Sequence, residues 1–574
     1  MPQEILISPG VLAIENDQSF VTTQPVQAGS AIIGPTVKGP VGIPTIVTTY
    51  SEYLNKYGDT FLSGSQTYSY FTSISAYNYF QNGGASLLVT RVVSGSTHWS
   101  PATSSFIPDS GSLNSVFVLE TLSEGQIMNS TSPLNADGTL PSGSADNFRW
   151  QIVSPNINTG TFSLLIRRGN DSTNSPSILE SWGPLSLDPL SSNYIEKVIG
   201  NQAENVASDS GEFYIQLSGS YRNASSYVRV KQVNITTPNY LDNSGNPKPQ
   251  YTASIPTAAS GTFGAAFGSN LPNGTGNYYE NISDSLPQGI PASEYTDSIY
   301  LLSNKDAYKF NFITVPGLIY DFSSHTSTIS LLDSVCSNNG NSMLVFDLKS
   351  YGSQVSSVAL EASGIDSSYA AAYWPWVRTI DPGTGQQVWV PASTMIPGVY
   401  AFNDNAAEAW FAPAGTTRGL MPTVIMAERY LTQGNRDTLY EANVNPIATF
   451  PNVGVVVFGQ KTLQKKASAL DRVNVRRLLI ELKNYITQIA DTLVFEQNTV
   501  ATRNNFLLQV NPYLSSVQQR NGLYAFRVVM DETNNTPTTI DNNQLIGAIY
   551  LQPTKTSEFI YLDFNVLPTG VSFG

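Results

Sequence analysis

Residues 441–505, EANVNPIATFPNVGVVVFGQKTLQKKASALDRVNVRRLLIELKNYITQIADTLVFEQNTVATRNN, join the signal for a buried strand to the signal for a long helix. The stretch opens with a turn-rich approach at residues 443–451, and the Val-rich run at 454–458 is typical of a short buried strand. Ser468 is expected to cap the helix, with Asp471 in its first turn, where a carboxylate suits the helix dipole. Apolar residues then recur every three or four positions, which predicts one buried helix face. They are Val475, Leu478, Leu479, Leu482, Ile486, Ile489 and Leu493.

Positive charge is concentrated in the same stretch. Between residues 461 and 483 there are seven basic and two acidic residues, a local net charge of +5 in a chain whose net charge is −14. Six of these bases, here called the basic cluster, lie just before the predicted helix or on one flank of its apolar stripe. The basic cluster consists of Lys461, Lys465, Lys466, Arg472, Arg476 and Lys483. By themselves, such bases are explained by long side chains that border an apolar face and keep their charges in water.

Several motifs in this region resemble the C-terminal domain of contractile-tail sheath proteins, most closely those of bacteriophages with long contractile tails of the T4 type. The similarity runs in order over residues 410–574, and several ordered motifs are more specific than one short pattern. Residues 31–40 and the N-terminal Ser8-Pro9-Gly10-Val11 are also similar. The C-terminal motifs are Asn445-Pro446, residues 454–461, Asp471-Arg472-Val473-Asn474-Val475-Arg476-Arg477-Leu478, Phe495-Glu496 and Asp531-Glu532-Thr533-Asn534-Asn535-Thr536-Pro537.

Changes in sequence texture predict a multidomain fold that combines α/β and α+β parts. Strands alternate with helices over residues 28–93 and again after residue 300, which indicates one discontinuous α/β layer. Between them the chain is rich in Ser, Gly, Asn and Pro, with short strand-like runs. The resemblance implies that this β-rich insertion is the outer part and that the C-terminal domain is the inner part. The expected units are an N-terminal arm (1–20), a split α/β domain (21–93 and 300–390), an inserted β-rich outer region (94–299), a conserved C-terminal inner domain (391–552) and a terminal strand or arm (553–574).

Both ends of the chain carry alternating apolar residues. They are Ile5, Ile7 and Val11 at the start, and Ile560, Leu562, Phe564 and Val566 at the end. A terminal strand with apolar residues on both faces needs a sheet to join, because an unpaired edge is prone to association. Pairing within the same subunit is the plain interpretation. The resemblance implies pairing in trans, in which arms of neighbouring subunits complete a sheet in a third.

Composition excludes several functional classes. Only 13% of the residues are charged, and the acidic balance argues against general nucleic-acid binding, which needs a positive surface. The single cysteine, Cys336, excludes intramolecular disulfides and is expected to be a small buried hydrophobe. No apolar run approaches the roughly 20 residues that span a bilayer, and the N-terminus lacks the pattern of a secretory signal. The sequence therefore predicts no direct membrane insertion and synthesis in a cytoplasm.

The sequence offers little catalytic chemistry. His98 and His325 lie 227 positions apart, so surface or capping roles are expected for both. The pattern has no cysteine or histidine cluster for zinc, and the Gly-rich turn at residues 34–39 lacks the Lys-Ser/Thr of a phosphate loop. We therefore expect no catalytic residues, cofactor or metal. A pair of carboxylates acting as a glycosidase inside the insertion is the enzyme alternative that stays open.

The resemblance implies a structural subunit of a contractile phage tail sheath. It implies copies assembled as hexameric rings in a helical lattice around a tail tube, in contact with baseplate and tail-terminator or neck proteins. The basic cluster would face the tube, and contraction would drive the tube through the host envelope. The location would be the virion tail, after synthesis in the host cytoplasm. The sheath of a non-phage contractile injection system is the near alternative, and a β-rich glycan-binding tail adhesin is the alternative from another class.

Overall fold

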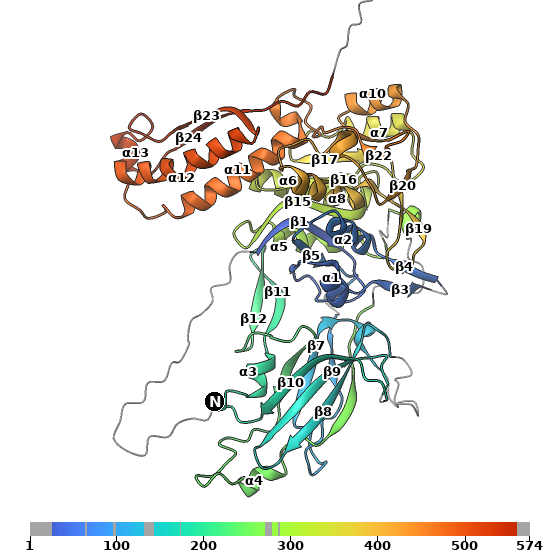
Figure 1. Cartoon of the computed structure of the whole chain (residues 1–574), viewed down its shortest axis with the longest axis vertical. Coiled ribbons are helices and arrows are strands. Elements are labelled where there is room, and N and C mark those ends of the chain that lie inside the picture. Colours follow the sequence, from blue (N-terminus) through green and yellow to red (C-terminus); the bar gives the residue numbers. More distant parts are fainter. Residues whose placement is uncertain are drawn as a thin grey trace, which may run out of the picture.

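The computed structural model describes residues 26–63, 66–95, 99–130, 143–172, 174–269, 278–284 and 288–559. The terminal-arm residues named above, Ile5, Ile7, Val11, Ile560, Leu562, Phe564 and Val566, lie outside the described residues, as does His98. Figure 1 shows a mixed α/β body in the middle, a β-rich module below it and a helix-rich module beside its upper part. The mixture of helices and strands is the α/β multidomain class that the sequence predicts.

An eight-stranded, mostly parallel sheet forms the centre of the body. Its strand order is β2-β5-β1-β15-β16-β17-β21-β22, with antiparallel pairing at the two outermost positions. The strands are β1 (Val26–Gly34), β2 (Thr45–Val47), β5 (Leu87–Arg91), β15 (Tyr308–Ile319), β16 (Met343–Asp347), β17 (Ala370–Trp374), β21 (Asn445–Phe450) and β22 (Gly454–Val457). Strands from before and after the insertion therefore lie side by side, and the last two lie beyond residue 390.

Helices cover both faces of this sheet, so its central strands are buried on both sides. Alternate residues of a strand enter different cores: Ile32 contributes to one core, and Ala31 and Ile33 contribute to the other. The first core includes residues of α1 (Tyr50–Tyr57), α2 (Phe71–Gln81) and α8 (Ala392–Ala406). The second includes residues of α5 (Thr296–Leu302), α6 (Ser323–Asn339), α7 (Val355–Ala362) and α10 (Gln433–Glu441).

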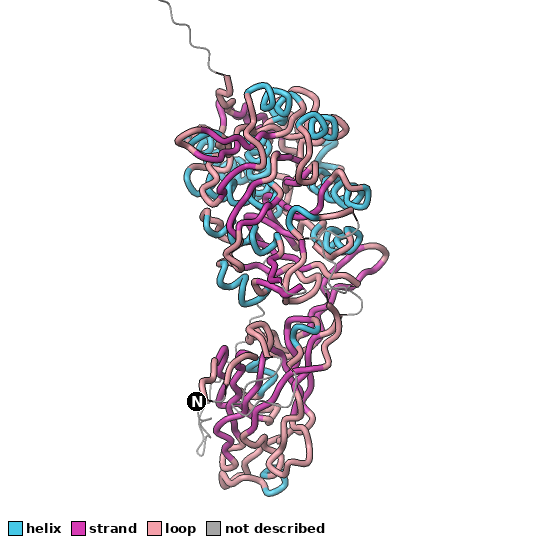
Figure 2. The backbone as a smooth tube through the Cα atoms, turned by 90° about the vertical axis from the view of Figure 1, so that its right-hand side faces the viewer, coloured by secondary structure: helices cyan, strands magenta, loops and turns pink. Residues whose placement is uncertain are grey.

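Most of the chain between β5 and α5 forms a separate β-rich module. Its main sheet has seven antiparallel strands in the order β10-β9-β8-β14-β6-β7-β13, and the side view in Figure 2 shows this strand-rich part below the body. The strands are β6 (Pro101–Ser104), β7 (Phe117–Glu124), β8 (Phe148–Asn156), β9 (Thr161–Arg168), β10 (Ile178–Ser186), β13 (Val228–Val233) and β14 (Ala259–Gly264). Two short helices, α3 (Ile195–Ile199) and α4 (Pro249–Thr252), belong to the same module.

Two buried bases of the body hold the junction with the β-rich module. The Arg91 guanidinium donates a hydrogen bond to the backbone oxygen of Glu124 at 3.0 Å, and Lys38 pairs with Asp146 at 3.4 Å. Burial lowers the pKa of Arg91 to about 10 and also lowers the pKa of Lys38. The hairpin of β11 (Ala203–Asp209) and β12 (Glu212–Ser218) adds a third contact, because Phe213 stacks on Tyr300 of α5 with ring centroids 5.7 Å apart.

Smaller sheets complete the body. One has the order β19-β18-β20, with β18 (Val377–Ile380), β19 (Gln387–Val390) and β20 (Val424–Ala427), and another is the hairpin of β3 (Thr60–Ser63) and β4 (Gln66–Ser69). The short helix α9 (Gly415–Arg418) follows α8. Residues 445–450 were expected to lie in a turn-rich approach, and this expectation is wrong, since they form β21. The Asn445 side chain donates to the backbone oxygens of Ala372 and Lys461, so tertiary pairing outweighs the local turn signal.

The helix-rich module contains α11 (Val473–Asp491), α12 (Val500–Gln519), α13 (Pro537–Asp541) and a hairpin of β23 (Leu523–Val529) and β24 (Ala548–Pro553). The structure confirms the predicted apolar stripe of α11, which is buried or half-buried along its length. The predicted helix start is wrong. Ser468 caps a 3-10 turn at Ala469–Asp471, and α11 begins only at Val473 because Arg472 has extended backbone.

Replacing Leu514 with Ala tests the core of the helix-rich module. Leu514 is fully buried on α12, so the substitution is expected to cost about 2–5 kcal/mol of the free energy of unfolding through lost burial and a cavity. The matched control is Leu508→Ala on the same helix, where the side chain is 73% exposed and the expected change is within about 0.5 kcal/mol. Urea titration, monitored by hydrogen exchange of α11 and α12, measures the free energy of unfolding of both variants. Equal losses of stability in the two variants would contradict the assigned core.

Candidate functional site

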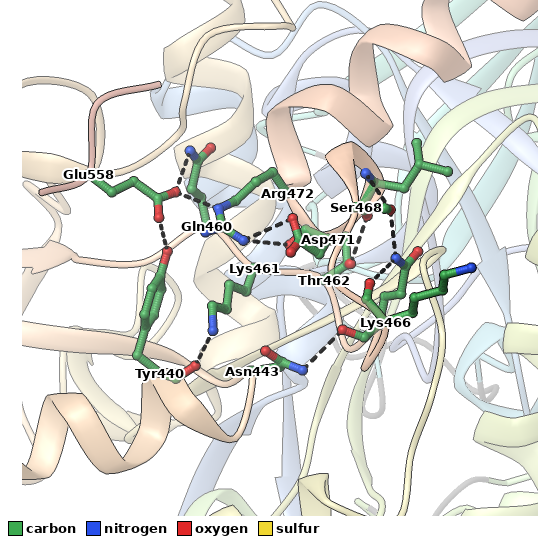
Figure 3. Close-up of polar contacts among 12 residues, drawn as sticks. Tyr440, Asn443, Gln460, Lys461, Thr462, Lys466, Ser468, Asp471, Arg472 and Glu558 are labelled. Atoms are coloured by element: carbon green, nitrogen blue, oxygen red, sulfur yellow. Dashed lines mark hydrogen bonds and ion pairs between the residues drawn. The ribbon is translucent and has the colours of Figure 1, made fainter. Parts of the chain in front are cut away.

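The basic cluster lies where α11 meets the body, and its first member, Lys461, is engaged within the subunit. Its ammonium donates to the backbone oxygen of Tyr440 at 2.7 Å and lies over the Tyr440 ring at 4.4 Å (Figure 3). An isolated β-bridge also joins Lys461 to Arg472. Burial lowers the pKa of Lys461, and the neighbouring Arg472 charge lowers it further.

Arg472 is held between two carboxylates. Its Nε donates to Glu558 Oε1 at 2.7 Å, and its guanidinium also pairs with Asp471 at 2.9 Å (Figure 3). Burial acts to lower the pKa of Arg472, but the hydrogen bond that it donates to Glu558 and the nearby acidic charges outweigh burial and raise the pKa. The side chain is 26% exposed, so most of its surface is already in contact with its own chain.

Arg476 is buried rather than displayed. It is 3% exposed, donates from Nε to the backbone oxygen of Ser368 at 2.9 Å, and lies over the Tyr369 ring at 3.9 Å. Burial lowers its pKa. Lys483 approaches the same tyrosine, with its Nζ 3.1 Å from the Tyr369 hydroxyl, but its side chain stays exposed. Tyr369 therefore contacts both bases on this flank of α11.

Lys465 and Lys466 present the clearest positive surface of the cluster. Both are exposed on the loop between β22 and α11. The backbone nitrogen of Lys465 donates to Asp366 at 2.9 Å, which anchors the loop and leaves the side chain at the surface. The structure thus divides the six predicted residues: Lys465, Lys466 and Lys483 are exposed, Lys461 and Arg472 are half-buried, and Arg476 is buried.

Sequence reasoning missed the acids that meet these bases. Glu558 comes from the C-terminal segment, 86 positions after Arg472, and no local pattern marks it. Arg477, beside Arg476 on α11, is 4% exposed, pairs with Asp404 of α8 and lies over the Tyr400 ring at 4.5 Å. The aromatic and acidic residues of α8 gave no signal in the sequence that linked them to α11, because their spacing along the chain is long.

Other titratable groups are structural in character. His325 was expected at the surface or as a cap, and its placement is wrong: it is fully buried and accepts a hydrogen bond from the backbone nitrogen of Ile319 at 2.9 Å. Burial lowers the pKa of His325 to about 4 and raises the pKa of the buried Cys336 to about 12. Among the described residues, no group of three or more His, Cys, Asp or Glu side chains is arranged to hold a metal ion. None of the helices in the described part of the chain has the length and apolar character that crossing a membrane requires.

Replacing Arg476 with Ala tests its internal role. The substitution removes the guanidinium from Ser368 and the Tyr369 ring, so a loss of about 1–3 kcal/mol in the free energy of unfolding is expected. Lys466→Ala is the control, because this exposed side chain is expected to leave the unfolding midpoint unchanged. Chemical denaturation compares the two variants. If both unfold at the same midpoint as the unchanged protein, Arg476 does not support the fold.

Comparison with known proteins finds matches to two domains of phage tail sheath proteins. Residues 288–463 match the phage tail sheath protein central domain, and residues 465–567 match the phage tail sheath C-terminal domain. Over 209 residues the chain is 37% identical to the tail sheath protein of Vibrio phage KVP40 and 36% identical to that of Enterobacteria phage T4. These matches cover 36% of this chain and 31% and 32% of the two relatives, so the chain spans about a third of the length of the curated relatives it matches.

A solved structure supports the fold beyond the matched residues. The sheath tail protein of Listeria innocua aligns with 92% of this chain and 96% of its own, at 10% identity and a TM-score of 0.51. At that identity the likeness concerns the fold alone. The two matched domains are consecutive and include the second half of the body sheet, α11 and the helix-rich module. Over residues 288–463 and 465–567, this chain is therefore similar to the central and C-terminal domains of phage tail sheath proteins.

Proposed function

We propose that this chain is the structural subunit of a contractile phage tail sheath. The observation that carries the proposal is the consecutive match of residues 288–567 to the central and C-terminal sheath domains, with identities of 36–37% to tail sheath proteins of phages. The work of such a subunit is packing and electrostatics between copies, with no bond made or broken. A sheath of a non-phage contractile injection system remains the near alternative, because it would use the same subunit architecture.

The proposed assembly is a homo-oligomer of hexameric rings stacked in a helical lattice around a tail tube, bounded by baseplate and neck proteins in the virion. The subunits would be made in the host cytoplasm. Many small contacts between copies would supply the free energy of contraction, because weak contacts sum over a lattice. In the proposed lattice, the body and the helix-rich module would form the inner surface, and the β-rich module would lie outside. The placement of the β-rich module at the opposite end of the body from α11 supports this arrangement (Figure 1).

The proposed tube-facing surface consists of the exposed members of the basic cluster. Lys465, Lys466 and Lys483 are available to a partner, whereas Arg476 is buried and Lys461 and Arg472 contact their own chain. Exposed charges act over about one Debye length, roughly 10 Å at 0.1 M salt, so such an interface would weaken as salt rises. The partner that fits is a tube surface bearing carboxylates.

The β23–β24 hairpin is the proposed acceptor for arms of neighbouring subunits. Among the described residues it is a two-stranded sheet, so each strand has an edge without a partner strand. One face covers α12, while Tyr524 and Tyr550 on the other face are 57% and 63% exposed. An open edge beside exposed aromatic rings suits strand addition, in which main-chain hydrogen bonds give the affinity. The proposed occupants are the terminal arms of neighbouring subunits, which include Ile5, Ile7, Val11, Ile560, Leu562, Phe564 and Val566.

Electron microscopy of the purified full-length chain tests the assembly and its arms together. Regularly striated hollow tubes are expected, because identical open edges propagate a lattice. Removing residues 560–574 is expected to leave a folded subunit, since the described body lies entirely before them, and to abolish tube formation. The circular dichroism spectrum checks that folding is retained. Normal tubes from the truncated chain would contradict the arm mechanism.

Reversing the charge of both exposed loop lysines tests the tube-facing surface. The double variant Lys465→Glu/Lys466→Glu is expected to lower co-sedimentation with the tube at least about tenfold in 0.1 M salt, because the interface depends on exposed charge. Arg222→Glu/Lys305→Glu makes the same change in net charge at exposed positions away from the cluster and serves as the matched control. Equal tube binding by the two double variants would show that Lys465 and Lys466 do not contribute to the interface with the tube.

A further inference from the structure

The carboxylate of Glu558, one residue before the end of the described chain, has three hydrogen-bond partners. Glu558 Oε1 accepts hydrogen bonds from Gln460 Nε2 at 3.0 Å and Arg472 Nε at 2.7 Å, and Oε2 accepts one from the Tyr440 hydroxyl at 2.7 Å (Figure 3). The Glu558 side chain is 16% exposed. Its donors come from α10, from the turn after β22 and from the residue before α11, so one side chain joins three separate segments of the body.

The residues before Glu558 are held to the helix-rich module by hydrogen bonds. Thr554 donates from its backbone to Gly522 at 3.2 Å, and Thr556 Oγ1 accepts from Asn474 at 3.2 Å. Thr554 and Glu558 are half-buried, whereas Lys555, Thr556 and Ser557 between them are exposed. We call residues 554–558 the strap.

The strap carries the end of the described chain from the helix-rich module to the body. β24 ends at Pro553 beside β23 in the helix-rich module, but the strap then runs past the start of α11 to α10 of the body (Figure 1). Donors to an ionised carboxylate make stronger hydrogen bonds than neutral pairs. Burial raises the pKa of Tyr440, and the Glu558 charge raises it further, so this hydroxyl stays protonated and continues to donate. Glu558 is therefore the strongest single attachment of the strap.

We infer that Glu558 is a pin that fixes the departure point of the C-terminal arm at α10 of its own subunit. By holding the strap across the boundary between the helix-rich module and the body, it sets the position from which the following residues reach a neighbouring copy. The pin also commits Arg472 to the strap, which removes that base from the tube-facing surface. The positioning role rests on the proposed sheath function, whereas the attachment itself does not.

Tryptic cleavage at Lys555 in the full-length, unassembled chain measures the attachment. Lys555 is exposed but lies inside the strap, so cleavage requires the strap to open, and the rate of cleavage follows the open population. Glu558→Ala is expected to speed release of the peptide that begins at Thr556 at least about tenfold, as loss of hydrogen bonds to a charged group implies. Tyr440→Phe, which removes one donor and keeps the ring, is expected to speed it about threefold.

Glu532→Ala is the matched control, because Glu532 is an exposed acid of the same module outside the strap, and its cleavage rate is expected to be unchanged. Unchanged cleavage in both Glu558→Ala and Tyr440→Phe would overturn the pin. Microscopy of Glu558→Ala then tests positioning: scarce or irregular tubes support it, and normal tubes with fast cleavage overturn it. If the unchanged chain fails to assemble around a tail tube, the result counts against the sheath function only. The attachment of the strap by Glu558 is decided separately, by the cleavage rates.

Discussion

The parallel pairing of β1 with β15 is the constraint on which the rest of the structure depends. Ser30 aligns with Phe312 and Ile32 with Thr314, and β5 pairs along the other edge of β1. Backbone groups in a buried sheet need hydrogen-bond partners. Because β5 and β15 both pair with β1, the chain leaves the body for the β-rich module and returns from it next to β1. Because the strands are parallel, the chain returns along the sheet through α5 before it enters β15.

Buried bases lie at the junction between the body and the β-rich module, where the chain leaves the sheet. Arg91 is the last residue of β5, at the point where the chain leaves the sheet, and it reaches back across the junction to the backbone of Glu124. A buried cation is costly unless it is paired or hydrogen-bonded, so Arg91 and Lys38 favour one relative placement of the two parts. Together with the stack of Phe213 on Tyr300, these contacts hold the β-rich module against the body at three points.

The start of α11 joins the body to the helix-rich module, and its charges serve that junction. Arg477 pairs with Asp404 and Arg472 pairs with Glu558, so acids from two distant segments compensate part of the positive excess. What remains at the surface is mainly Lys465, Lys466 and Lys483. Arg476 and Arg477 thus fasten the helix and Arg472 holds the strap, which leaves a smaller positive surface of exposed lysines.

The sequence by itself determined the elements whose signals are local. The three- and four-residue spacing of Leu478, Leu482 and Ile489 marked the buried face of α11, and the Val-rich run marked β22, because periodicity needs only neighbours along the chain. Only the tertiary structure decided that β21 is a strand, that Arg476 is buried against Tyr369, and that Glu558 meets Arg472. β17, which pairs with β21 inside the sheet, and the residues Tyr369 and Glu558 all lie tens of residues from their partners along the chain. A charged side chain has the same local sequence pattern whether it meets water or a distant carboxylate.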